Sequence, residues 1–290
     1  MGYRTRAYGI PGSLADYHPD AHEAIERWFT MPNTGNSRAV ADIIEDLVPM
    51  RPAAVVDPFC GAGSTALAAR RLGIPFVGVE TDPVLACVST AKSLCGPDDG
   101  QALLELPEAD ESPALRCLRL VHRLQHLPGG GRLSAQMITE DLSRGAPHVP
   151  GSMVVRGDST VRATWEKLTL PDGELVIFTS PPFFDDWTGP EVPPQVRVEA
   201  ESLLAGGVTQ DSYPAARGYG DLLVGALRAA QTVVPHCTAI VEHEPGSGPP
   251  DRLLEVADRL THEAGLEIVE ILETSRFSPG GLFSLLVCRL

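Results

Sequence analysis

Short apolar runs recur along the chain and alternate with stretches whose apolar residues repeat at helical spacing. Runs of this length, bounded by Gly, Pro, Asp or Ser, are typical of buried strands. The runs that predict strands are Ala53–Val56, Phe76–Val79, Met153–Val155, Glu174–Thr179, Cys237–Glu242, Leu266–Leu272 and Phe283–Leu290. Strands that alternate with helices in this way predict an α/β domain with a mostly parallel sheet of seven strands.

Helical stretches fill the intervals between these runs. Val40, Ile43, Ile44 and Leu47 repeat at spacings of three and four, with Asn36 or Ser37 as the candidate cap. Further helices are predicted over residues 65–72, 84–94, 160–168, 219–233 and 251–264. The last two apolar runs are separated by Ser278-Pro279-Gly280-Gly281, which predicts an antiparallel hairpin at the end of a doubly wound sheet.

Residues 95–152 interrupt this alternation, because the next expected strand is missing. The segment begins acidic and then places Arg116, Arg119 and Arg123 between leucines, which predicts an amphipathic helix with a basic side. A solvated helix face is the common explanation for such arginines, and contact with a phosphate backbone is the other. We interpret 95–152 as a helical insert, either a lid or a recognition element, within a main domain of residues 36–290. Residues 1–35 contain Tyr3, Tyr8, Tyr17, Trp28 and Phe29, and we expect this segment to pack near the active site.

Composition limits the classes of function. With 290 residues, 43% of them hydrophobic, the chain can bury a full core. No apolar run reaches the ~18 residues of a membrane span, and the N-terminus lacks the apolar block of a secretory signal, so we expect a cytoplasmic protein without membrane contact. The six cysteines form no C-x-x-C pair, which predicts reduced thiols. The histidines His122, His126, His243 and His262 are expected at the surface, and no metal site is predicted. The net charge of -15 disfavours a broad DNA-gripping face but leaves room for a local basic groove.

The turn after the first predicted strand has the features of a cofactor site. It consists of Asp57, Pro58, Phe59, Cys60, Gly61, Ala62, Gly63, Ser64 and Thr65. Gly61 and Gly63 lack the Cβ that would obstruct a nucleotide at the carboxyl end of a strand. The spacing is not G-x-G-x-x-G, and Asp57 would repel a pyrophosphate but attract a cationic or amine-bearing cofactor. Glu80 ends the second strand, where a carboxylate can accept hydrogen bonds from two ribose hydroxyls, and Asp158 follows the third, where it can accept from an adenine amino group. Taken singly, a tight strand-to-helix turn or a helix cap explains each of these residues.

A second motif, Thr179-Ser180-Pro181-Pro182-Phe183, follows a later predicted strand. The Ser180 hydroxyl and the Pro181 carbonyl can each accept one N–H of an aromatic amine, which favours a pyramidal nitrogen with its lone pair aimed at an electrophilic methyl. Pro182 stiffens the turn, and Phe183 can stack on the acceptor ring. Phe184 and Trp187 extend the same wall; packing explains Trp187 equally well. An isolated motif of this kind is more often a simple strand stop.

Together the two motifs resemble the paired signature of the S-adenosylmethionine-dependent DNA amino-methyltransferases, which modify the exocyclic amine of adenine or cytosine. The resemblance implies a class I methyltransferase-like fold with S-adenosylmethionine as cofactor. It implies that Phe59 to Ser64 surround the methionine part of the cofactor, with Thr65 following and Asn33 contributing. It also places the cofactor ribose at Glu80 and Thr81 and the adenine at Asp158. Serine at the start of the second motif favours cytosine over adenine. Methylation of carbon 5 of cytosine is disfavoured, because it needs a nucleophilic Cys where this chain has Pro182.

Other functions remain open. We expect no separate target-recognition region of substantial size within the predicted domain. The acceptor classes that stay open are a base of DNA, a base of RNA, and an amine or amide in a peptide or small metabolite. A noncatalytic relative that binds only cofactor or a partner protein is a third possibility. The intact Asp57, Gly61, Gly63, Glu80 and Ser180 argue against it, because these would be lost first.

Overall fold

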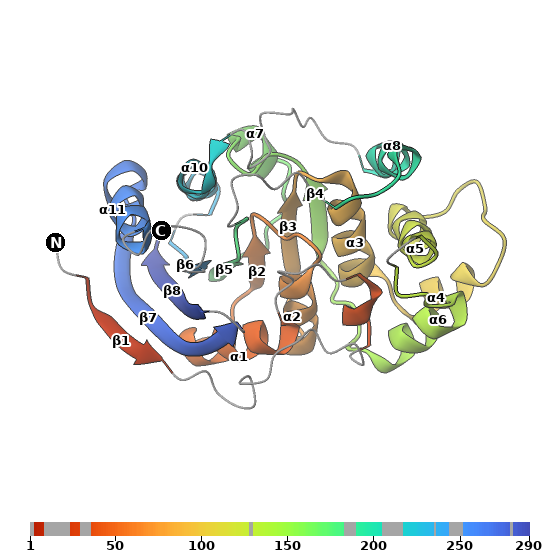
Figure 1. The fold of residues 1–290 in the computed structure, drawn as a ribbon, viewed down its shortest axis with the longest axis horizontal. Coiled ribbons are helices and arrows are strands. Elements are labelled where there is room, and N and C mark those ends of the chain that lie inside the picture. The colour runs from red at the N-terminus through yellow and green to blue at the C-terminus, as the bar shows by residue number, and fades with distance from the viewer. Residues whose placement is uncertain are drawn as a thin grey trace.

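The computed structural model describes residues 3–8, 24–29, 36–127, 130–182, 190–204, 217–234, 236–243, 252–278 and 281–290. Within these ranges a single sheet of eight strands forms the centre of the molecule (Figure 1). The strands are β1 (Thr5–Tyr8), β2 (Ala54–Asp57), β3 (Phe76–Glu80), β4 (Met153–Arg156), β5 (Leu175–Thr179), β6 (Thr238–His243), β7 (Glu267–Ser278) and β8 (Gly281–Arg289). Their order across the sheet is β1-β7-β8-β6-β5-β2-β3-β4.

The helices join these strands and cover the sheet. They are α1 (Ser37–Leu47), α2 (Ser64–Leu72), α3 (Pro83–Leu94), α4 (Pro97–Leu103), α5 (Pro113–Leu124), α6 (Ala135–Arg144), α7 (Arg162–Trp165), α8 (Pro194–Leu203), α10 (Tyr219–Gln231) and α11 (Arg252–Ala264), with a short 3-10 helix, η2, at Glu26–Trp28. None of the helices in the described ranges is long and apolar enough to cross a membrane.

The strand pairings confirm the predicted fold class. β2 pairs in parallel with β3 and β5, β3 with β4, and β5 with β6, whereas β8 runs antiparallel between β6 and β7. The chain is therefore a doubly wound, mostly parallel sheet with a C-terminal antiparallel hairpin. Because five neighbouring strands run the same way, their carboxyl ends open on one edge, where ligands of such sheets bind.

The sheet has one strand more than the seven predicted. β1 pairs in parallel with β7 at the outer edge. Only Tyr8 of its four side chains is buried, so the strand lacks the apolar run from which strands are predicted. Helix α7 is also shorter than the predicted helix over 160–168, because the chain turns after Trp165.

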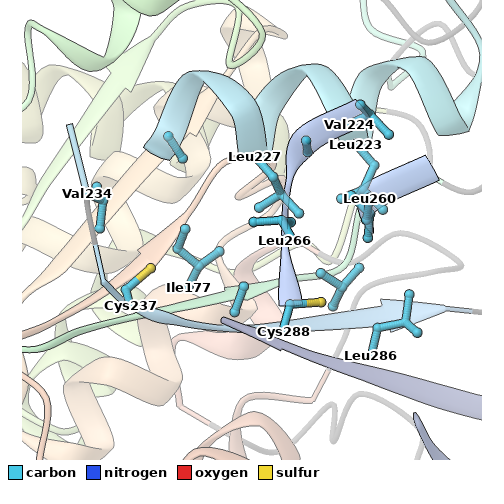
Figure 2. Close-up of a cluster of buried hydrophobic side chains, with 14 of the residues drawn as sticks. Ile177, Leu223, Val224, Leu227, Val234, Cys237, Leu260, Leu266, Leu286 and Cys288 are labelled. Atoms are coloured by element: carbon cyan, nitrogen blue, oxygen red, sulfur yellow. The ribbon is translucent and has the colours of Figure 1, made fainter. Parts of the chain in front are cut away.

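Alternating side chains of the strands fill a separate core on each face of the sheet. Val56, Ile177 and Val241 pack with α10 and α11, whereas their neighbours Val55, Phe178 and Ile240 pack with α1 and α2. Figure 2 shows part of the first core, in which Leu223, Val224 and Leu227 of α10 meet Ile177, Leu286 and Cys288 of the sheet. This packing fixes α10 and α11 over β5, β6 and β8.

The described part of residues 95–152 forms α4, α5 and α6 beside α3, at the β4 edge of the sheet (Figure 1). The short N-terminal helix η2 packs against them. Arg27 forms an ion pair of 2.6 Å with Asp141 of α6, the Trp28 indole donates to the same carboxylate, and Lys92 of α3 donates to the Phe29 carbonyl. These contacts join the N-terminal part of the chain to the insert. The expectation that residues 1–35 pack near the active site stays a prediction.

Candidate active site

The two sequence motifs begin at neighbouring strand ends. β2 and β5 are adjacent and parallel, with Val56 opposite Ile177. Asp57 ends β2 and Thr179 ends β5, and the Thr179 hydroxyl donates a hydrogen bond of 2.7 Å to Asp57 Oδ1. The bond joins residues 122 positions apart in the sequence. The turn after Asp57 and the Ser180-Pro181-Pro182 turn therefore leave the same edge of the sheet side by side.

The turn after β2 is held by its own side chains. Phe59, Cys60 and Ala62 each pack into a different hydrophobic cluster, and Cys60 and Ala62 are buried. Burial also raises the pKa of the Cys60 thiol well above its ordinary value, so this thiol stays protonated. If Cys60 and Ala62 contact a ligand, they therefore do so through their main-chain atoms. Thr65 is buried behind the turn and Ser64 is half-buried at the start of α2.

Glycine is required at position 63 by conformation and by space. Gly63 has φ +85° and caps α2, and a Cβ at this position would lie 3.2 Å from both Cα and Oγ of Ser89 on α3. Gly61 also has a positive φ, of +48°, but a Cβ there would meet only the Phe59 carbonyl, at 3.8 Å. The turn therefore packs closely against Ser89 of α3 at Gly63, with little room for a Cβ between them.

We expect Gly63→Ala to destabilise the protein by about 2 kcal/mol, because the left-handed backbone alone costs an alanine ~1 kcal/mol or more and Ser89 must also move. The matched control is Gly265→Ala, since Gly265 has φ +69° and no atom within 4 Å of its Cβ position. The control should lose only the backbone contribution, about 1 kcal/mol. Urea unfolding of both variants measures the difference, and equal losses would show that the contact with Ser89 is unimportant.

Glu80 ties the end of β3 to this turn. Its Oε2 accepts the Gly61 N–H at 2.8 Å, and its Oε1 accepts the Asp82 N–H at 2.8 Å and the Thr81 hydroxyl at 3.3 Å. Burial raises the pKa of Glu80 to about 7. A carboxylate offers roughly four acceptor positions, so the three donors leave capacity for a further hydroxyl donor. Glu80 can therefore position the turn and receive a ligand at once.

Asp57 is fully buried, and this burial raises its pKa from 3.8 to about 6 despite hydrogen bonds from Thr65, Thr179 and the Phe59 N–H. The charged form is thus disfavoured in the folded protein. A raised pKa of an acid means that stability is greatest at low pH and is lost as the pH rises through about 6.

Asp57→Asn keeps Oδ1, which accepts both the Phe59 N–H and the Thr179 hydroxyl, and removes the titration. We expect the free energy of unfolding of the wild type, relative to this variant, to fall by about 3 kcal/mol between about pH 4 and pH 7 and then to level off. Urea unfolding of both proteins across this range measures the difference. A difference independent of pH would mean that Asp57 does not titrate there.

Asp158 lies two residues after β4 and is buried in an ion pair that the sequence did not predict. Its Oδ1 accepts the N–H and hydroxyl of Thr160, and its Oδ2 lies 2.8 Å from the Arg217 guanidinium. Arg217 also contacts the Thr160 hydroxyl. An adenine amino group at Asp158 would share this carboxylate with Arg217.

The second motif leaves β5 directly, and its Ser180-Pro181-Pro182 turn is called the amine clamp after the role predicted for it. Ser180 and Pro182 are half-buried and Pro181 is buried. Phe183, Phe184 and Trp187, and also Asn33, lie outside the described residues, so their predicted roles stay predictions. The described chain resumes at Pro190, and α8 begins at Pro194. Arg197 of α8 forms an ion pair of 2.6 Å with the buried Asp82, two residues after Glu80, and donates to the Pro190 carbonyl. Helix α8, which follows the clamp in the sequence, is therefore held beside the end of β3, near Glu80.

The basic side of the insert is largely occupied by structural contacts. Arg119 pairs with Glu111 at 2.6 Å and donates to carbonyls of Ala102, Leu103 and Glu105, and Arg123 pairs with Glu199 of α8. Arg116 remains exposed. These contacts explain two of the three arginines without a phosphate.

One histidine prediction is wrong. His262 and His126 are exposed and His122 is half-buried, but His243 is buried at the end of β6. Arg217, Tyr219 and Arg197 were not predicted as site residues, because no local motif marks them. Each is found only through its partner at a strand end, which is Asp158 for Arg217, His243 for Tyr219 and Asp82 for Arg197.

The chain has limited similarity to known proteins. No family model matches it. A stretch of 71 residues is 30% identical to the Type II methyltransferase M.BsoBI of Geobacillus stearothermophilus, over 24% of this chain and 14% of that protein. Among solved structures, TrmN from Thermus thermophilus is similar with 13% identity and a TM-score of 0.44, over 87% of this chain and 48% of the other. A TehB-like SAM-dependent methyltransferase from Corynebacterium glutamicum is similar with 16% identity and a TM-score of 0.41, over 89% of each chain. The chain thus spans about half of the TrmN chain and matches a small part of M.BsoBI, and the assignment of an activity depends on the site residues.

Proposed function

We propose that the chain is an S-adenosylmethionine-dependent N-methyltransferase that acts on an exocyclic amine of a nucleic-acid base, with cytosine favoured over adenine. The observation that carries this proposal is the Thr179–Asp57 hydrogen bond. It holds the start of the amine clamp against the end of the strand that carries the cofactor turn. Transfer of a methyl group needs donor and acceptor in line, and alignment of this kind supplies much of the rate gain.

The donor side is formed by the turn after β2 and the ends of β3 and β4. Gly61 and Gly63 allow a close approach of the main chain, Glu80 receives the ribose hydroxyls, and Asp158 lies near the adenine. When bound, S-adenosylmethionine supplies an electrophilic methyl on a positively charged sulfur. The buried acids Asp57 and Glu80 favour a cation at this edge. The 71-residue match to a Type II methyltransferase supports methyl transfer as the reaction.

The acceptor side is formed by Ser180, Pro181, Pro182 and the residues that follow them. The lone pair of an aromatic amine is delocalised into its ring, so the nitrogen is a poor nucleophile. The Ser180 hydroxyl and Pro181 carbonyl accept its two N–H groups and favour the pyramidal form. Phe183, Phe184 and Trp187 would stack on the flipped base, as enzymes that modify bases require. A serine rather than an acid at position 180 favours cytosine.

The domain organisation follows from this assignment. Residues 36–290 would act as the methyltransferase domain, with 95–152 as its helical insert, and residues 1–35 would pack near the active site.

A second candidate is methyl transfer to an amine or amide of a peptide or small metabolite. The net charge of -15 and the ion pairs that occupy Arg119 and Arg123 favour it, because few basic residues remain to contact phosphates. The same clamp would accept the N–H groups of an amide.

Product analysis separates the two candidates. The protein is incubated with methyl-tritiated S-adenosylmethionine and, separately, with DNA, RNA, peptides and a small-molecule extract, and labelled nucleosides are identified by chromatography. We expect label in N4-methylcytosine from the DNA, or less readily from the RNA. Label confined to peptides or small molecules would reject the nucleic-acid assignment, and absence of label in every class would reject the enzyme.

A further inference from the structure

A buried pair of side chains, Tyr219 and His243, stands at the same edge of the sheet as the amine clamp. The Tyr219 hydroxyl lies 3.1 Å from His243 Nδ1, and the two ring centroids are 5.6 Å apart at an angle of 58°. Tyr219 is the first residue of α10 and His243 the last residue of β6. Each side chain is at most 3% exposed.

The hydrophobic core fixes this pair. Tyr219 belongs to the same cluster as Leu223 and Leu227 of α10 and Val241 of β6. Figure 2 shows the neighbouring part of that cluster, where α10 lies across the strands with its leucines pointing at them. Neither α10 nor β6 can shift without disrupting this packing, so the imidazole has a defined position.

The strand register places His243 beside the clamp. β5 and β6 are parallel neighbours, and Thr179 lies opposite Val241. β5 ends at Thr179, and the Ser180-Pro181 turn follows directly, whereas β6 continues for two residues past Val241 to His243. Side chains two apart share a face of a strand, so His243 stands on the side of the sheet to which Val241 and Ile177 belong. The imidazole therefore lies on the strand next to β5, at the edge from which the clamp turn leaves.

The reaction creates a need for a proton acceptor at this place. A carbon–nitrogen bond forms from the nitrogen lone pair as the donor carbon–sulfur bond breaks, with its electron pair passing to sulfur. The nitrogen is then positively charged and must lose one N–H proton. Neither the Ser180 hydroxyl nor the Pro181 carbonyl is a base of useful strength. β5 is flanked by β2 and β6. Of the described residues that end these two strands, Asp57 of β2 lies on the donor side, and His243 of β6 is the other candidate proton acceptor.

We propose that His243, held by Tyr219, takes the proton that the acceptor nitrogen releases on methylation. The proposal rests on the proposed N-methyltransferase function and names a further residue of that same site. The neutral imidazole becomes imidazolium and later returns the proton to solvent, so the step needs no other reactant. Among the described residues, the groups near His243 include Tyr219 from α10, the neighbouring Glu242 on β6, whose side chain points to the other face of the sheet, and the uncharged Ser284 opposite it on β8.

The test compares His243→Asn with Tyr219→Phe. Asparagine keeps a polar atom near Tyr219 but cannot take up a proton, and phenylalanine keeps the packing of α10 but removes the hydroxyl that orients the imidazole. His262→Asn is the matched control, because His262 is exposed on α11. Single-turnover rates are measured from about pH 5 to pH 8, the range in which histidines titrate, with the acceptor that the wild type methylates. Cofactor affinity is measured by calorimetry.

We expect His243→Asn to lower the rate about 100-fold at pH 7, at the lower end of what proton transfer by a side chain contributes, and to abolish the rise of the rate with pH. Tyr219→Phe should keep that rise with a smaller loss, and His262→Asn should match the wild type. Cofactor affinity should stay within twofold in all three. In the wild type, the imidazole nitrogen signals of His243, assigned by their loss in His243→Asn, should shift when acceptor and demethylated cofactor are added together.

Wild-type rates and pH profile in His243→Asn, or imidazole signals that do not respond to the acceptor, would overturn the role of His243. If His243→Asn does not fold, the rate and pH profile of Tyr219→Phe decide, and a wild-type rate in that variant would overturn the role of the pair. Wild-type protein that transfers no methyl group to any acceptor would instead overturn the proposed function.

Discussion

Ser180→Ala should lower turnover by about 100-fold to 1000-fold, as the loss of one preorganised hydrogen-bonding group does in other active sites. The variant loses the side-chain acceptor for one N–H of the amine and keeps the Pro181 carbonyl. The nitrogen then stays closer to its planar, delocalised form, in which its lone pair does not point at the methyl. Cofactor affinity should change less than twofold, because the donor side is built from β2, β3 and β4 and Ser180 follows β5. Calorimetry and single-turnover kinetics measure the two quantities separately.

Ser202→Ala is the matched control for this prediction. Ser202 is exposed on α8, and its hydroxyl donates to the Glu199 carbonyl one turn earlier. It should leave turnover unchanged. If Ser180→Ala turns over like the control, the Ser-Pro-Pro turn is a strand stop and the clamp assignment is wrong.

Glu80→Gln should weaken cofactor binding about 100-fold. In the wild type both carboxylate oxygens accept a main-chain N–H, from Gly61 and from Asp82. An amide nitrogen cannot accept, so one of these N–H groups loses its partner and the turn loosens. A ribose hydroxyl also loses a charged acceptor, and a hydrogen bond to a charged group contributes ~1.5–3 kcal/mol. The loss of one such bond accounts for the expected factor, because 100-fold corresponds to about 2.7 kcal/mol.

Calorimetry with the demethylated cofactor product measures the loss without turnover. The same substitution at an exposed position, Glu166→Gln, removes the surface ion pair with Arg162 and should bind as the wild type does. The stability of Glu80→Gln should fall by ~1–3 kcal/mol through the unpaired N–H, so binding is measured well below its unfolding temperature. Unchanged affinity would place the ribose elsewhere.

The sequence predicts the centre of the fold because periodicity and turn chemistry there act over short distances. The apolar runs of β2, β3, β5 and β6 are each bounded by residues that end a strand, and the run of β8 follows a Gly- and Pro-rich turn. β1 could not be predicted in the same way. It lies at the sheet edge with three of its four side chains exposed, and its place depends on the exposed edge of β7, more than 250 residues away.

The residues of the candidate site fall into the same two groups: those that a local motif predicts, and those that only folding brings to the site. Asp57, Gly61, Gly63 and Ser180 belong to contiguous motifs, so the sequence alone selects them. Arg217 and His243 matter because of what folding brings beside them, and neither has a motif of its own. The buried His243 was expected at the surface because a single histidine in a sequence carries no sign of what covers it.

The basic stripe of α5 gives the opposite lesson. Its three arginines have the spacing of a phosphate-binding helix face. In the structure, Arg119 instead satisfies Glu111 and the carbonyls at the end of α4, and Arg123 reaches α8. Charge pattern along one helix does not reveal which acids the neighbouring helices supply.

We have proposed that the carboxyl ends of β2, β3 and β4 form a binding site for a methyl donor beside an amine clamp. This site can be tested by calorimetric titration of the full chain with S-adenosylmethionine and with its demethylated product. We expect one site per chain for both ligands, with a dissociation constant below ~1 mM, the upper end of ordinary substrate affinities. No heat of binding from either ligand at millimolar concentration would contradict it.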